Sequence, residues 1–173
     1  MNSDFALKNE EKDYLLMEKF NENLLKLKDL GKTETMHHSD ATGNTTDGRV
    51  INIELKSRNM NLLPNFTVSG VSYTQKTYTA DTIYIESHKM ADLLLDYVID
   101  KKVPLYVNFI NDDTVILYNL SMLKQRPKTV TKRIPSKLYE GFEMGKRMEL
   151  PISEAFIYKR IGNNNWKQIH KPQ

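Results

Sequence analysis

The sequence predicts an α/β fold of the α+β kind, in which helices flank a mixed central β-sheet. Two segments, over about residues 9–30 and 88–100, have apolar residues at helical spacing. The segments between and after them read as strands, and turn residues join two pairs of these strands as hairpins. Strands and helices in this order bury their apolar faces by packing helices against a sheet.

The two predicted helices differ in how they end. The first begins near Asn9 and ends at Leu30, since Gly31 follows as a stop. Its inward stripe consists of Leu16, Met17, Phe20, Leu24 and Leu27. The second runs from His88 to Asp100, and its inward residues are Met90, Leu93, Leu94, Tyr97 and Val98.

The predicted strands fall into two hairpins and single segments. In the first hairpin, residues 32–41 and 50–58 flank the turn-rich GNTTDGR, and in the second PLYVNFI and TVILYNL flank Asn111–Asp113. A short strand is expected over 81–87. Residues 59–80 contain Pro64 and Gly70 and are expected to form a long, partly irregular loop. The final third is expected to be less regular, with one added edge strand in ELPISEAFIYKRI and a frayed tail from Asn163.

Length and composition limit the class of protein. The 173 residues suit one domain over 1–173, and 39% hydrophobic with 27% charged residues is ordinary for a globular chain. The absence of cysteine excludes disulfides, thiolate zinc sites and cysteine nucleophiles. A net charge of +3 permits a nucleic-acid partner without arguing for one. Because there is no secretion signal and no run of about 18 apolar residues, we expect a cytoplasmic protein with no membrane partner.

One acidic-x-lysine pattern lies inside a predicted strand, with an acidic residue on the strand before it. Along VINIELK the apolar residues Ile51, Ile53 and Leu55 alternate with Asn52, Glu54 and Lys56. If Thr46-Asp47-Gly48 is a three-residue loop with Gly48 in the left-handed conformation, Asp40 lies opposite Glu54 on one face. A two-residue turn would shift the register by one residue and move Asp40 to the other face.

Two facing carboxylates repel each other unless a cation or a proton lies between them. Their oxygen atoms suit Mg²⁺ or Mn²⁺, and a nearby lysine could position a water or stabilise charge on a phosphate. The spacing alone equally allows a surface salt bridge between Glu54 and Lys56 beside an unrelated Asp40.

At these residues the sequence resembles the PD-(D/E)XK nuclease superfamily, which has the restriction-endonuclease-like fold. The similarity lies in HHSDATGNTTDGRVINIELKSR, with Asp40, Glu54 and Lys56 in the motif positions, and it extends over a nuclease-like core of about residues 9–120. Residues 121–173 form a C-terminal extension. Ser39 stands where the proline that gives the family its name would be.

The resemblance implies metal-dependent hydrolysis of a nucleic-acid phosphodiester, with DNA the commoner substrate. Asp40, Glu54 and the carbonyl of Leu55 would hold Mg²⁺ or Mn²⁺, and Lys56 would act on the attacking water. Some members add an acidic residue from the first helix, where Asp13 lies on the apolar stripe and Glu18 and Glu22 point away. The alternatives are a catalytically inactive nucleic-acid-binding or assembly module with the same fold, and an enzyme acting on another phosphate ester. A homodimer and a subunit of a larger complex both suit the size of the chain.

Further residues are candidates for auxiliary roles. His38 shares a face with Asp40 if the strand is regular, and Lys89 lies near where the family often places an auxiliary polar residue; a plain histidine and a surface lysine are the alternatives. A basic group could contact phosphates or could line a solvated loop; it consists of Arg58, Lys124, Arg126, Lys128, Lys132 and Arg133.

Overall fold

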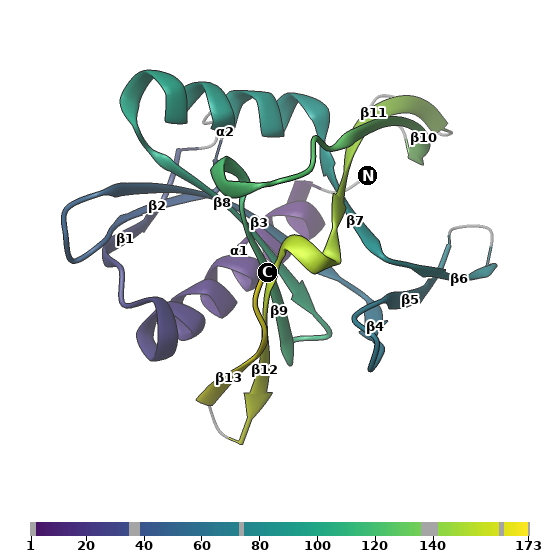
Figure 1. Cartoon of the computed structure of the whole chain (residues 1–173), viewed down its shortest axis with the longest axis horizontal. Helices are drawn as coiled ribbons and strands as arrows, with labels where there is room; N and C mark the ends of the chain where they lie inside the picture. The colour runs from purple at the N-terminus through teal and green to yellow at the C-terminus, as the bar shows by residue number, and fades with distance from the viewer. Residues whose placement is uncertain (1–2, 35–38, 73–74, 136–141, 163–164, 173) are drawn as a thin grey trace.

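The computed structural model describes residues 3–34, 39–72, 75–135, 142–162 and 165–172. Its two longer helices are α1 (Ser3–Phe20) and α2 (Ser87–Asp100). A π-helical turn, η1 (Asn21–Leu25), extends α1, and two short 3₁₀ turns are η2 (Leu120–Met122) and η3 (Ile152–Glu154). The architecture is therefore mixed α and β, as the sequence predicts (Figure 1).

A seven-stranded mixed sheet forms the centre, in the order β1-β2-β3-β8-β9-β12-β13. Its strands are β1 (Lys28–Lys32), β2 (Ala41–Asn44), β3 (Val50–Arg58), β8 (Val103–Ile110), β9 (Thr114–Asn119), β12 (Phe156–Ile161) and β13 (Asn165–His170). Strands β3 and β8 pair in parallel, with Glu54 beside Tyr106, and the other neighbours are antiparallel. The chain between β3 and β8 includes α2, as a parallel connection requires.

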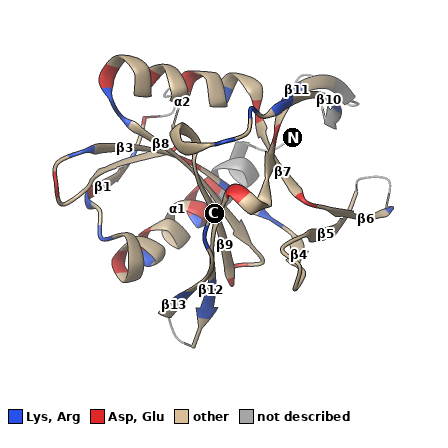
Figure 2. Cartoon of the chain, viewed as in Figure 1, with Lys and Arg blue, Asp and Glu red and all other residues tan. Residues whose placement is uncertain are grey.

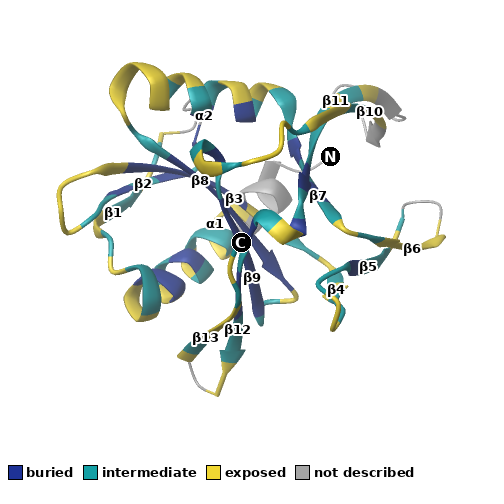
Figure 3. Ribbon diagram, in the orientation of Figure 1, coloured by how far each residue is buried: buried dark blue, intermediate teal, exposed yellow. Residues whose placement is uncertain are grey.

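Two apolar clusters cover the two faces of this sheet. On one face, α1 places Met17 and Phe20 against Ile53, Val107 and Phe109. On the other, α2 and two strands of a smaller sheet pack on the central strands; the fully buried side chains there include Ile83, Leu93, Ile116, Tyr118 and Leu150. Figure 3 shows the central strands as the buried part of the molecule and the outer side of α2 as exposed. The even-numbered positions of β3 thus face α2, and the odd-numbered ones face α1.

The first helix ends earlier than predicted. Lys26 adopts a left-handed conformation with φ 55° and ends η1, and the chain turns into β1. The side chain of Asn21 fixes this turn, since its amide donates to Leu27 O at 3.0 Å and its carbonyl accepts from Leu27 N at 2.7 Å. Gly31 therefore lies within β1 and is not a helix stop. On α2, Val98 is 63% exposed and does not point inward as predicted, whereas Met90 and Leu93 are buried.

Two three-stranded sheets account for segments that were expected to be irregular. Residues 59–80 form β4 (Met60–Leu62), β5 (Val68–Val71) and β6 (Thr77–Ala80), which pair with one another and place Val68 in the core. The second sheet has the order β10-β11-β7 and consists of β10 (Lys128–Pro135), β11 (Phe142–Pro151) and β7 (Thr82–Glu86). Backbone pairing that is distant in sequence, such as Met148 with Ile85, makes the final third regular.

The C-terminal extension also completes the large sheet. Strand β12 pairs with β9 on one side and with β13 on the other, so it is an inner strand and not the predicted edge. The tail from Asn163, predicted to fray, supplies β13, and His170 Nδ1 lies 2.9 Å from Ala155 O. Within the described residues, no helix is long and apolar enough to cross a membrane.

Candidate functional site

The turn between β2 and β3 sets the register that the site depends on. Gly48 has φ +85°, Gly48 N donates to Thr45 O at 3.0 Å, and Thr45 N donates to Arg49 O at 2.9 Å. This is the predicted three-residue loop. Ala41 pairs with Ile53, so counting one residue back along β2 places Asp40 opposite Glu54. The prediction that the two carboxylates share a face is therefore confirmed.

Asp40 and Glu54 are held by different contacts. Asp40 Oδ2 accepts a hydrogen bond from Leu55 N at 2.7 Å, and the Asp40 amide donates to Ile53 O at 2.9 Å. The contact from Leu55 to the pair thus runs through its amide, whereas the resemblance implies a role for its carbonyl. The side chain of Asp40 is 35% exposed and that of Glu54 is 11% exposed. Asp40 is therefore accessible to solvent, and Glu54 is largely buried.

The ammonium of Lys89 lies between the two carboxylates. Lys89 Nζ is 2.8 Å from Glu54 Oε2 and 3.9 Å from Asp40 Oδ1. Lys89 is in the first turn of α2, reaches Glu54 on β3, and has a side chain that is 25% exposed. The residue predicted as auxiliary is therefore an integral part of the acidic pair.

Burial, and after it the negative charge of Asp40, raise the pKa of Glu54 to about 7, against the opposing effect of Lys89 and Lys56. Burial by itself lowers the pKa of Lys89, but its hydrogen bond to Glu54 and the charges of Glu54, Asp40 and Glu86 raise it overall. A carboxyl group that titrates near neutral pH because it is buried beside another carboxylate is typical of functional sites.

Lys56 projects from the same face as Glu54, two residues further along β3, and is exposed. It is close enough for its charge to favour the ionised form of Glu54. Lys56 also lines a polar hollow of about 530 Å³ at the carboxyl ends of the parallel strands β3 and β8, with Lys12, Asp13, Ser57, Arg58, Asn59, Asn111 and Asp112. Crevices at the carboxyl ends of parallel strands are frequent ligand sites.

Arg58 turns into the protein. Its Nε donates to Asn108 Oδ1 at 2.8 Å, and one terminal nitrogen donates to Tyr84 O at 2.5 Å and to the hydroxyl of Tyr106 at 2.6 Å. Tyr106 Oη also donates to Tyr84 O at 2.8 Å. Protein acceptors thus engage Nε and one terminal nitrogen of Arg58, and its role as a phosphate contact stays a prediction. Arg58 ties β3 and β8 to β7 below the acidic pair.

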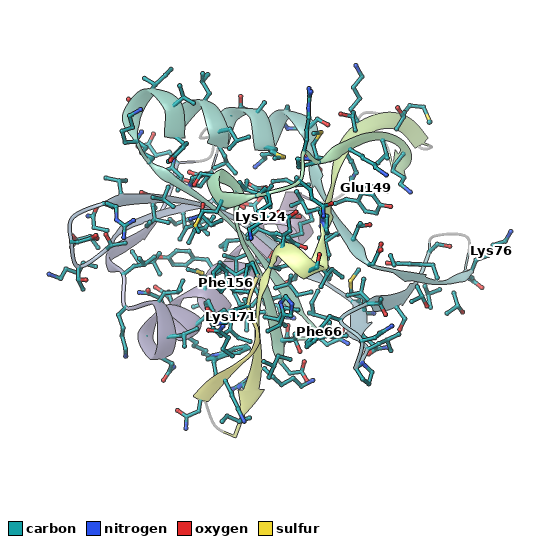
Figure 4. All side chains as sticks on the ribbon, viewed as in Figure 1. Phe66, Lys76, Lys124, Glu149, Phe156 and Lys171 are labelled. Carbon is teal, nitrogen blue, oxygen red and sulfur yellow. The ribbon has the colours of Figure 1, made fainter. Side chains whose placement is uncertain are left out.

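The polar face of the β10-β11-β7 sheet borders the acidic pair. Arg147 on β11 lies 3.7 Å from Glu86 on β7, and Glu86 immediately precedes α2. The hydroxyl of Tyr84 donates to Glu149 Oε1 at 3.1 Å, and the ammonium of Lys132 lies 4.7 Å from the centre of the Tyr84 ring. Figure 2 shows basic residues on the described part of β11, and Figure 4 labels Glu149 of the same strand.

The remaining predicted nucleic-acid contacts are dispersed. Lys128 and Lys132 belong to β10, and Arg126 is exposed just before that strand. Lys124 lines a separate hollow of about 580 Å³ with Asn119, Phe156 and His170 among its neighbours, and its amide donates to Glu154 Oε2 at 2.7 Å (Figure 4). The side chain of Arg133 and the whole of His38 lie outside the described residues.

Asp13 does not join the acidic pair. Its carboxylate accepts hydrogen bonds from the amide of Ser57, at 3.2 Å, and from the Ser57 hydroxyl. Ser57 is an odd-numbered residue of β3, so this contact lies on the face covered by α1. Ser39, which takes the position of the family's proline, is 2% exposed, and its carbonyl accepts a hydrogen bond from the Thr33 hydroxyl.

The metal that the resemblance implies can be tested against the donor atoms. Among the described residues, no group of three or more histidine, aspartate or glutamate side chains could hold a metal ion. The facing pair Asp40 and Glu54 supplies two carboxylates, and Mg²⁺ is often bound by one or two carboxylates together with water and substrate phosphates. The pair therefore fits Mg²⁺ or Mn²⁺ as a partial ligand set, provided that Lys89 moves away from Glu54.

Comparisons of the chain with protein-family models, with curated proteins and with solved structures found no match. The interpretation of function therefore depends only on the arrangement of side chains in this protein.

Sequence reasoning named Lys89 only as an auxiliary residue and missed Glu86 and Arg147. The only sequence feature that pointed to Lys89 was its position at the start of a helix that follows a strand, and this does not show that Lys89 pairs with both carboxylates. No local signal pointed to Glu86 or Arg147, because they reach the site through pairing between β7 and β11.

Proposed function

We propose that this protein is a metal-dependent nuclease that hydrolyses nucleic-acid phosphodiester bonds, with DNA as the first substrate to test. The proposal includes a restriction-endonuclease-like fold, for which the order helix α1, hairpin β2-β3, helix α2 and strand pair β8-β9 gives support. The cytoplasmic location also stays a prediction.

One observation carries the proposal: a buried carboxylate, a partly exposed carboxylate and two lysines lie together beside one face of the sheet. In a surface salt bridge neither carboxylate has to be buried, whereas here burial beside Asp40 raises the pKa of Glu54 to about 7, and such shifts are typical of functional sites. Glu54 is largely buried and pairs with Lys89 from a different element, which disfavours a plain surface salt bridge between Glu54 and Lys56.

In the proposed mechanism, Asp40 and Glu54 would hold Mg²⁺ or Mn²⁺, which supplies Lewis-acid polarisation of the phosphodiester when bound. Asp40, the accessible carboxylate, faces solvent and is fixed by the Leu55 amide. Lys56 would orient the attacking water or stabilise negative charge that develops on the phosphate. The hollow beside Lys56 would receive the chain on one side of the scissile bond.

The test compares purified wild type with Lys56→Ala and Lys167→Ala on linear, circular and branched DNA in Mg²⁺ or Mn²⁺. Lys167 is a matched control because it is an exposed strand lysine on β13, at the far edge of the sheet from β3. We expect wild type and the control to cleave, and we expect cleavage to disappear in Lys56→Ala and in chelator. Equal inertness of all three proteins, without Mn²⁺ binding at Asp40 and Glu54, would favour the nucleic-acid-binding or assembly module.

A further inference from the structure

Lys89 occupies the position that a divalent ion would need. Its ammonium is 2.8 Å from Glu54 Oε2 and 3.9 Å from Asp40 Oδ1, and so it already neutralises the pair that would bind the metal. A divalent ion and an ammonium repel each other, and repulsion at such distances is strong in a half-buried site. Metal binding at Asp40 and Glu54 therefore requires the ammonium to leave.

The lysine side chain is suited to this movement. It is a point charge on a flexible four-carbon stem, whereas an arginine would present a rigid fork. Lys89 comes from α2, Glu54 comes from β3 and Asp40 lies just before β2, so the ammonium can move while both acids stay in place. Lys56, in contrast, lies on the same strand as Glu54 and is exposed.

Once displaced, the ammonium needs another anion, because it remains partly buried. Glu86 is close enough to raise the pKa of Lys89, but it already lies 3.7 Å from Arg147 and 3.6 Å from His88. A phosphate group bound beside the acidic pair supplies the missing negative charge, and lysine is a frequent phosphate ligand.

We propose that Lys89 is a mobile positioning residue that holds the acidic pair in the resting protein and transfers to a substrate phosphate when the metal binds. This inference rests on the proposed function and adds a consequence to it: metal and nucleic acid bind cooperatively through Lys89. By thermodynamic linkage, each ligand strengthens the binding of the other by the same factor.

The experiment measures Mn²⁺ binding by electron paramagnetic resonance at about pH 8, where the ionised form of Glu54 prevails. Wild type, Lys89→Met and Lys102→Met are compared with and without a phosphorothioate-linked DNA that resists cleavage. Lys102 is the matched control, because it pairs with Asp100 at 3.0 Å and is 30% exposed, close to the 25% of Lys89. Lys89→Gln serves as a second variant if Lys89→Met folds poorly.

In wild type and Lys102→Met, we expect the DNA to tighten Mn²⁺ binding by about tenfold, within the usual range of coupling between sites. In Lys89→Met, Mn²⁺ should bind several-fold more tightly without DNA, and the DNA should change its affinity by less than about twofold. Weaker Mn²⁺ binding in Lys89→Met, or coupling equal to that of wild type, would overturn the role of Lys89 while leaving the nuclease proposal intact. Absence of Mn²⁺ binding in every protein would overturn both.

Discussion

Replacing Glu54 with glutamine is expected to stabilise the fold at alkaline pH. Burial and the charge of Asp40 raise the pKa of Glu54 from 4.5 to about 7. Each pKa unit corresponds to about 1.4 kcal/mol, so ionising this buried group costs the folded protein on the order of 3 kcal/mol above pH 7. Glutamine removes the charge but leaves Lys89 without its nearest partner, so we expect a net gain of about 1–3 kcal/mol.

The sign of the pH dependence follows from where the proton is held. Between about pH 4.5 and pH 7 the folded protein keeps a proton on Glu54 that the unfolded chain has lost, so the stability of wild type falls over this window as pH rises. Glu54→Gln has no proton to lose at this position, so its stability does not fall for this reason over the same window. The difference in unfolding free energy between the two proteins should therefore be small near pH 5 and reach its full value near pH 8.5.

Urea unfolding of wild type, Glu54→Gln and Glu149→Gln at these two pH values measures the effect. Glu149 is a suitable control because it is a partly buried carboxylate outside the pair, where it accepts a hydrogen bond from Tyr84. A stabilisation that is equal at both pH values, or a loss of more than about 1 kcal/mol near pH 8.5, would refute the reasoning that an ionised Glu54 is costly. A gain confined to alkaline pH would show that the site carries a stability cost, as sites selected for activity often do.

Two further predictions concern the scaffold of the site. Arg58→Ala should lower the unfolding free energy by about 1–3 kcal/mol, because it leaves the buried side-chain carbonyl of Asn108 without its donor. Arg49→Ala should cost less than about 1 kcal/mol, since Arg49 forms an exposed ion pair with Asp47. Equal losses in urea unfolding would contradict the structural role of Arg58. Gly48→Ala should lower the unfolding free energy by about 1–2 kcal/mol, because the φ of Gly48 is +85°. Gly31→Ala is the control and should change it little, since Gly31 has an ordinary φ and its nearest neighbour is 3.9 Å away. An unchanged stability of Gly48→Ala would contradict the turn that sets the register.

The sequence by itself predicted a hairpin turning at Asp47-Gly48 and the alternation along β3, whereas the structure decided the turn type and placed β2 at Ala41–Asn44 instead of residues 32–41. Alternation along β3 predicts which side chains share a face, and Asp47-Gly48 predicts the turn, because both depend only on the period of a strand and on the freedom of glycine at positive φ. The common face of Glu54 and Lys56 follows from this alternation, and that of Asp40 and Glu54 follows from the three-residue turn that the structure has. The helix α2 and the hairpin β8-β9 were also predictable, since their apolar patterns are strong and local.

Only the tertiary structure decided what surrounds the pair. Lys89 reaches Glu54 across 35 positions of sequence, and Tyr84 reaches Glu149 across 65. The end of the first helix depends on the two hydrogen bonds between the Asn21 side chain and the Leu27 backbone. Strand β13 forms because it pairs with the free edge of β12. These contacts depend on packing between segments that the local pattern does not relate. The hairpin thus carried the two acids and Lys56, and the folding of distant segments supplied the ammonium that now occupies their shared position.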